Sequence, residues 1–245
     1  MIIAQEKKKT NIAEYILYMW QIEDMIRANQ FNMDLIEKNI IQKFDQPEDI
    51  KEEMQEWYKD LVRRMQEEGI QEKGHFQFLH DIVDELENLH MTLIRDPNEL
   101  EYIQAYNTAK PGIAELRNKS QGTARGDIEA CLQGLYGILL LRLQNKPINP
   151  ATQDAQKSIS SLIALLSEKY LENKSNDSRK AIRGMPHPPY LILVQKLITY
   201  ILIWHKALFP LAKPFVSISG NGIIQWIPEK SRDEGKDIKQ GPGHA

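Results

Sequence analysis

The sequence predicts an all-α protein, and three observations lead to this fold class. Apolar residues recur at steps of three and four over most of the first 175 residues, which is the period of one helix face. Capping residues, some of them next to proline, precede these runs. No apolar–polar alternation long enough for a strand occurs in the same stretch. We therefore expect a bundle of about six or seven helices.

The first predicted helix begins after Asn11, which follows a basic run. The Asn11 side chain can cap the helix, and Glu14 stands three residues later, at the spacing of a capping box. The apolar positions then follow at helical spacing: Ile12, Tyr15, Ile16, Met19, Ile22 and Ile26.

Three further helix starts follow. Asn32 caps a short helix, and Pro47 stands in the first turn of a longer one that ends near Gly69. The next helix covers about residues 75–95, and its apolar residues share one face.

The second half of the bundle starts at another predicted cap. Asp96 is followed by proline, and the helix that it starts is expected to be interrupted at Pro111 and Gly112. Residues 128–143 are apolar on nearly every side, so we expect this helix to be the most enclosed. Asn149 and Pro150 predict the start of the last helix of the bundle.

The composition changes after residue 175. We divide the chain into a helical bundle domain at residues 1–175, a polar and proline-rich linker at 176–189, a segment at 190–230 and a disordered tail at 231–245. Asn221 and Gly222 predict a hairpin turn between two short strands.

Residues 190–211 predict an amphipathic helix. Lys196 and Lys206 lie on its polar side. Its other side carries Val194, Leu197, Ile198, Ile201, Trp204 and Leu208. The apolar run is too short for a membrane span. We favour packing on the first domain or on a partner, and peripheral membrane association remains an alternative.

Composition and charge exclude some classes of function. Hydrophobic residues make up 42% and charged residues 27%, as in an ordinary soluble protein. The net charge of −3 gives no basic footprint, so we expect no nucleic-acid partner. The single Cys131 excludes an intramolecular disulfide, and its apolar surroundings predict a buried core residue. The first nine residues do not match a signal peptide, so we expect a cytoplasmic protein.

One cluster has the residue types of a metal site. His80, Asp84 and Glu87 share one flank of the predicted helix, and Glu87-x-x-His90 matches the step used by di-iron bundles. Such a site needs a second step, and the other candidate, which ends at His75, straddles a predicted helix break. The interpretation that we favour is a solvated acidic flank beside a core histidine. We expect no metal ligands, no cofactor and no catalytic residues.

The opening segment also resembles a known family. Residues 8–28, and less specifically residues 137–143 and 159–170, are similar to a domain-of-unknown-function family (number 4924) of Bacteroidota. The resemblance covers about residues 1–172, where members of the family usually end. It implies a small, cytosolic, helical protein and brings no assigned activity or motif. Nothing from the family can be carried onto residues 176–245.

The function that the sequence favours is a non-enzymatic cytosolic helical protein that acts through protein–protein contacts. The partner is an unknown protein or a second copy. The first alternative is a helical bundle that binds a metal or small ligand near His80, Asp84 and Glu87. The second is peripheral membrane association through residues 190–211.

Overall fold

The structure, a computed structural model, describes residues 2–120, 122–181, 216–218 and 224–226. Within these residues the chain forms eight α-helices, one short 3-10 helix and two short strands. The α-helices are α1 Ile2–Thr10, α2 Ile12–Ala28, α3 Met33–Asn39, α4 Glu48–Glu67, α5 Gln77–Leu93, α6 Leu100–Lys119, α7 Asp127–Leu143 and α8 Pro150–Ala181. The 3-10 helix is η1 Ile41–Lys43, and the strands are β1 Val216–Ile218 and β2 Ile224–Trp226. The predicted helical class is confirmed for the bundle.

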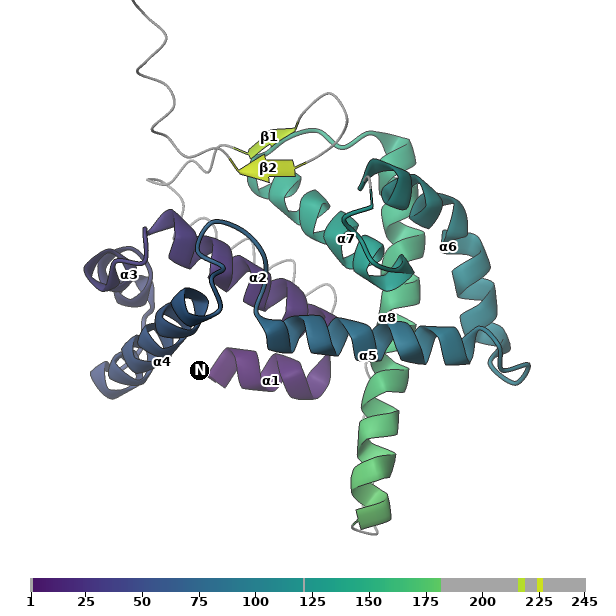
Figure 1. Ribbon diagram of the computed structural model, residues 1–245, viewed down its shortest axis with the longest axis horizontal. Helices are drawn as coiled ribbons and strands as arrows, with labels where there is room; N and C mark the ends of the chain where they lie inside the picture. The colour runs from purple at the N-terminus through teal and green to yellow at the C-terminus, as the bar shows by residue number, and fades with distance from the viewer. Residues whose placement is uncertain (1, 121, 182–215, 219–223, 227–245) are drawn as a thin grey trace, which may run out of the picture.

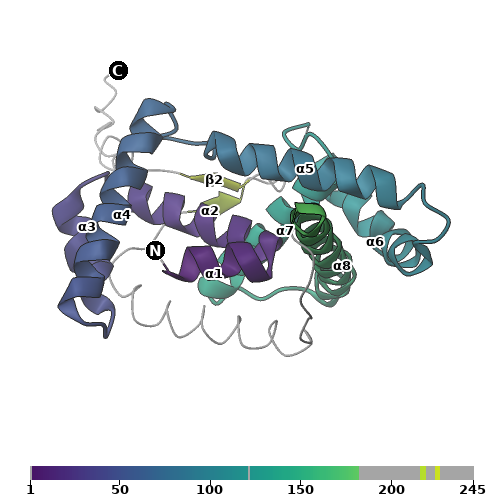
Figure 2. The same cartoon turned by 90° about the horizontal axis from the view of Figure 1, so that it is seen from below.

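The helices pack around α2, which contacts α1, α7 and α8 (Figure 1). At one end of the bundle α3 packs on α4, and at the other end α6 packs on α8 (Figure 2). Helix α5 runs along one edge and contacts α7 and α8. The last turns of α8 project beyond the other helices (Figure 1).

The core is one continuous cluster of apolar side chains contributed by α2, α4, α5, α6, α7 and α8, with contributions from the other helices. Tyr58, Tyr102 and Phe76 are the largest of the fully buried side chains. Buried aliphatic residues of α2, among them Ile16, Ile22 and Ile26, are completely enclosed. The predicted apolar face of this first helix is therefore the face that it buries.

The predicted helix caps at Asn11 and Asn149 form, and each involves residues only three positions apart. The Asn11 side chain accepts from Glu14 N at 3.1 Å, and the Asn149 side chain accepts from Thr152 N at 2.8 Å. The second half of the capping box differs, because Asn11 N already donates to a carbonyl of α1. The Glu14 carboxylate instead accepts from Asn11 Nδ2 and from Lys7. Burial raises the pKa of Glu14, and Lys7 lowers it in part.

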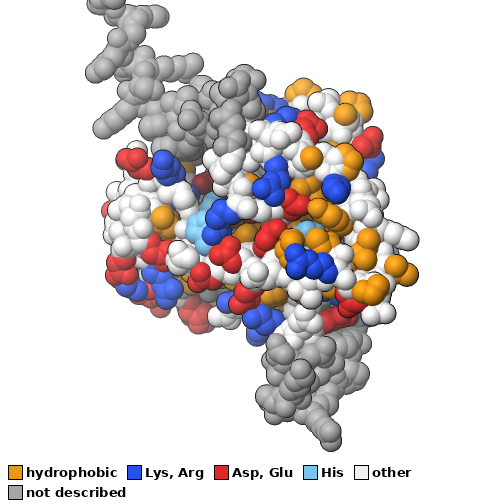
Figure 3. Space-filling model, turned by 45° about the vertical axis from the view of Figure 1, so that its right-hand side comes forward, with side chains coloured by type: hydrophobic (Ala, Val, Ile, Leu, Met, Phe, Trp, Pro, Cys, Tyr) orange, Lys and Arg blue, Asp and Glu red, His pale blue; other side chains and the backbone are white. Residues whose placement is uncertain are grey.

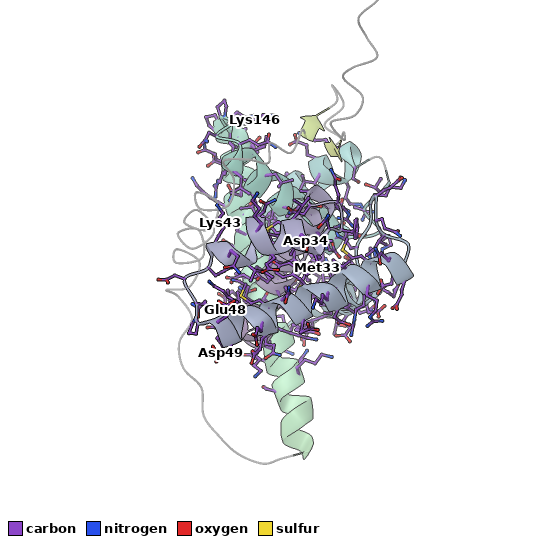
Figure 4. All side chains as sticks on the ribbon, turned by 90° about the vertical axis from the view of Figure 1, so that its left-hand side faces the viewer. Met33, Asp34, Lys43, Glu48, Asp49 and Lys146 are labelled. Carbon is purple, nitrogen blue, oxygen red and sulfur yellow. The ribbon has the colours of Figure 1, made fainter. Side chains whose placement is uncertain are left out.

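The helix starts at the α3–α4 end also follow the local sequence. Figure 4 labels Met33 and Asp34 at the start of α3, and Glu48 and Asp49 at the start of α4. Asn32 caps α3, since its side chain accepts from Asp34 N at 2.9 Å and from Leu35 N at 3.2 Å. Glu48 and Asp49 fill the first turn of α4, where negative charge interacts favourably with the helix dipole.

The expected number of helices is close to the number observed. Seven described helices, α2 to α8, follow Asn11, and the lysine-rich residues before Asn11 form one more, α1. This helix has too few apolar residues to show a period, and it folds against α2 through side chains such as Ala4, which is buried.

The expected interruption at Pro111 is wrong, because α6 continues through it. Pro111 lies on the exposed side, and next to it a Cβ at Gly112 would lie 3.3 Å from the Cβ of Ala155 on α8. Close packing along α8 therefore outweighs the one lost backbone hydrogen bond. The helix begins at Leu100 and not at the expected cap, where Asp96 accepts from Asn98 N in a turn.

Helix α7 is enclosed only in its first half. Ile128, Cys131 and Leu132 are fully buried, and burial raises the pKa of the Cys131 thiol. Beyond Gly137 the aliphatic side chains are half-buried. The expectation that this helix is the most enclosed is thus correct for its beginning and wrong for its end.

The expected boundary after the bundle also moves. Helix α8 continues to Ala181, so the first six residues of the expected linker at 176–189 are helical. Strands β1 and β2 pair antiparallel, with Ser217 opposite Gln225. The turn between them, the predicted amphipathic helix at residues 190–211 and the expected tail at 231–245 lie outside the described residues.

Candidate functional site

Glu87 caps α7 from the neighbouring helix α5. Its two carboxylate oxygens accept from the backbone N–H groups of Asp127 at 3.2 Å and Ile128 at 2.9 Å. The residue before this helix, Gly126, has no side chain to cap it. The first N–H groups of a helix lack intrahelical acceptors and attract negative charge. Glu87 therefore links two helices that lie far apart in the sequence, and it is not part of a solvated flank.

His80 and Asp84 are brought together by Arg125, in the loop before α7. Its guanidinium forms an ion pair with Asp84 at 3.2 Å and a hydrogen bond with His80 Nδ1 at 3.2 Å. Arg125 also pairs with Glu129, which is buried. Because a guanidinium can only donate, His80 Nδ1 is the acceptor and carries no proton.

His90 lies apart from these three residues, in the interior. It is 1% exposed, and its Nδ1 lies 2.8 Å from the hydroxyl of Tyr102. Burial lowers the pKa of His90, with smaller opposing contributions from Glu87 and Asp127. The expected core histidine is confirmed.

The structure therefore gives the four candidate ligands three different sets of partners. His80 and Asp84 meet at Arg125, Glu87 binds α7, and His90 pairs with Tyr102. In the part of the chain that the structure describes, no group of three or more His, Cys, Asp and Glu side chains is placed to hold a metal ion.

A second polar cluster, not anticipated from the sequence, lies on α2. Glu23 is fully buried and accepts from His75 Nδ1 at 2.5 Å and from Phe76 N at 2.8 Å. The ring of His75 stacks on Trp20, with ring centroids 4.4 Å apart. His75 also lies near His80, with ring centroids 6.1 Å apart. Figure 3 shows histidine side chains at the surface among charged side chains of both signs.

Arg27 continues this cluster one turn further along α2. Its guanidinium donates to the carbonyl oxygens of Ile70 and Gly74 and pairs with Asp24 at 3.0 Å. Asp24 in turn accepts from the hydroxyl of Tyr136 on α7. Glu23 and Arg27 thus hold the loop between α4 and α5 against α2, which compensates their burial with hydrogen bonds.

The sequence contains a signal for this cluster. Steps of four, three and four from Ile16 lead to Trp20, Glu23 and Arg27, so all four residues share one stripe of α2. A charged pair on a stripe that begins with buried residues indicates buried polar partners. Which loop supplies those partners depends on the tertiary fold.

The end of α7 forms an apolar surface of a different kind. It consists of Ile138, Leu139, Leu140, Leu141 and Leu143, which we call the α7 apolar end. All five side chains are half-buried. Consecutive residues point about 100° apart around a helix, so these side chains cover its whole circumference.

Two neighbouring helices occupy part of that circumference. A Cβ at Gly134 would lie 2.6 Å from Leu116 Cδ1, so α6 approaches α7 closely just before the apolar end. On another side, Arg142 donates to the Gln156 side chain of α8 at 2.7 Å. Helix α7 also contacts α2 and α5, yet all five side chains of the apolar end keep part of their surface exposed.

Fold and contacts together define an all-α domain with a buried polar network around α2 and an incompletely covered apolar helix end. The chain belongs to the family described as Domain of unknown function (DUF4924), whose model matches residues 1–177. This confirms the resemblance seen in the opening segment, over a range that reaches into the last turns of α8. No curated protein and no solved structure matches the chain.

Among the helices that the structure describes, none is both long enough and apolar enough to cross a bilayer.

Proposed function

We propose that this protein is a non-enzymatic helical binding module of the cytosol, and that it acts by binding an apolar protein segment at the α7 apolar end. Its one cysteine is buried and free, which fits a reducing compartment. The observation that carries the proposal is the run of five half-buried aliphatic residues at the end of α7.

The hydrophobic effect favours burial of the α7 apolar end against another apolar surface. A helix that is apolar all round is normally enclosed on all sides. Soluble monomers rarely expose large contiguous apolar patches, and those that occur often mark interaction sites. Helical partners bind such surfaces by placing their own apolar face against them.

The buried and half-buried polar side chains favour a structural role over a catalytic one. Glu87 holds the start of α7, and Glu23 and Arg27 hold the loop before α5. A metal site that used Glu87 would withdraw its carboxylate from two N–H groups of α7. The alternative of a metal or small-ligand site near His80, Asp84 and Glu87 would therefore weaken a helix start.

Site-specific photo-crosslinking in the native cell tests the proposal. A photoreactive phenylalanine analogue replaces Leu141, and in a matched control it replaces Leu100, which is isolated and 64% exposed. We expect protein adducts at position 141 that are absent at position 100, although Leu100 is the more exposed residue. Equal yields at the two positions, or adducts at 141 that contain only lipid, would contradict the proposal.

A further inference from the structure

The α7 apolar end covers less than two helical turns and is incompletely buried, and this chain carries an apolar pattern at helical spacing beyond α8 that can cover it. We infer that residues 190–211 dock in cis on the α7 apolar end. This inference rests on the proposed function and names the occupant of the same surface.

The apolar side of residues 190–211 matches the aliphatic side chains at the end of α7. The apolar side predicted for residues 190–211 offers Leu197, Ile201 and Leu208 at helical spacing. The α7 apolar end offers aliphatic side chains that the described helices cover only in part. Two apolar helix faces of this kind pack by interlocking their side-chain ridges.

The chain after α8 is long enough to return to the end of α7. The Arg142–Gln156 hydrogen bond fixes the end of α7 beside the first turns of α8. From Gln156 the helix rises roughly 38 Å to its last residue, Ala181. Residues 182–189 can span up to about 28 Å when extended, and residues 190–211 add about 33 Å as a helix. The chain can therefore turn back along α8 and reach the α7 apolar end.

The charged residues of this segment lie where docking does not bury them. Lys196 and Lys206 lie on the side of the predicted helix opposite its apolar residues. Docking through the apolar side leaves both lysines in water, so it requires no burial of charge. The arrangement also predicts which tail positions approach α7 and which do not.

Disulfide trapping in the full-length chain tests the inference. In a Cys131→Ala background, Leu141→Cys is combined in turn with Leu197→Cys, Ile201→Cys or Leu208→Cys. A disulfide forms only when the Cα atoms come within about 7 Å, so it reports close approach. Matched controls pair Leu141→Cys with Lys206→Cys on the polar side, and Leu100→Cys with each apolar-side cysteine. Thermal melts of the reduced variants exclude a general loss of structure.

We expect an intramolecular disulfide between Leu141→Cys and at least one apolar-side cysteine, formed at least about tenfold faster than in the controls. Equal rates in all pairs would overturn the inference, as would disulfides that link only two copies. Trapping that is abolished by dilution, or that requires anionic vesicles, would overturn it as well. If position 141 photo-crosslinks to another protein and no intramolecular disulfide forms, this inference fails and the proposed function stands. If position 141 crosslinks to no protein segment, neither within this chain nor in another protein, the proposed function fails too.

Discussion

The Glu87 carboxylate of α5 lies against the backbone of Gly126, in the space that a Cβ at this position would occupy. From there it accepts the hydrogen bonds of the first turn of α7. The backbone of Gly126 is extended, with a φ of −148°, so glycine is required here for space and not for conformation. A glycine and a glutamate about 40 residues apart therefore act as one capping unit.

This unit predicts a coupled pair of substitutions. Glu87→Ala should lower the free energy of unfolding by about 0.5–2 kcal/mol, because the N–H groups of α7 lose their acceptor. Gly126→Ala should also destabilise, because its Cβ displaces the carboxylate. In the double variant the two losses should not add, because the same contact has already been removed. Chemical denaturation of the four proteins measures the coupling, and strict additivity would contradict the capping role.

Two buried tyrosines on different helices form a matched pair. The hydroxyl of Tyr102 bonds to His90, whereas the buried hydroxyl of Tyr58 has no hydrogen-bond partner among the residues that the structure describes. Tyr102→Phe should destabilise by about 1–2 kcal/mol, because it leaves His90 Nδ1 unpaired. Tyr58→Phe should be neutral or stabilising, because it removes a desolvated polar group without loss of a bond. Melting temperatures of the two variants test this, and a larger loss for Tyr58→Phe would contradict the assignment of partners.

The buried imidazole of His90 predicts a pH dependence. Its pKa is lowered in the folded state, so the unfolded chain binds the proton more readily. The resulting contribution to stability is complete above the unfolded-state pKa of about 6.5 and decreases as the pH falls below it. When the pH falls from 7.5 to 5.5, the free energy of unfolding should decrease more for the wild type than for His90→Gln. This holds even if the two proteins already differ in stability at pH 7.5. Parallel pH profiles would show that His90 does not titrate on unfolding.

The helical bundle should fold without the rest of the chain. Among the side chains of α8 that the structure describes, Leu166 and Tyr170 are the last buried apolar ones, and the family match ends at residue 177. A chain that ends at residue 181 should therefore give a helical circular-dichroism spectrum and a cooperative melt. Recovery of this shortened chain only as an aggregate would mean that residues after 181 belong to the core.

Much of the helical pattern can be predicted from the sequence because it is local. The caps at Asn11, Asn32 and Asn149 act within three residues, and the apolar face of α2 follows from its period. The helix through Pro111 cannot be predicted in this way. Its continuity comes from packing against α8, more than 40 residues away.

In the candidate site, too, local features can be predicted from the sequence and contacts between distant segments cannot. The burial of His90 is predicted because it shares the apolar face of its own helix. The roles of Glu87, Glu23 and Arg27 depend on loops and helix starts that other segments bring to them. A side chain that binds the backbone of a distant element has no local signature, since spacing within one helix says nothing about its partner.

The accessibility of position 141 tests the central claim most directly. In a Cys131→Ala background, the rate of thiol labelling is measured for Leu141→Cys and for Leu100→Cys, each in the full-length chain and in the chain that ends at residue 181. If residues 190–211 cover the α7 apolar end, position 141 should react at least about tenfold faster in the shorter chain. Position 100 should react equally fast in both chains. Equal labelling of position 141 in the two chains would contradict the account.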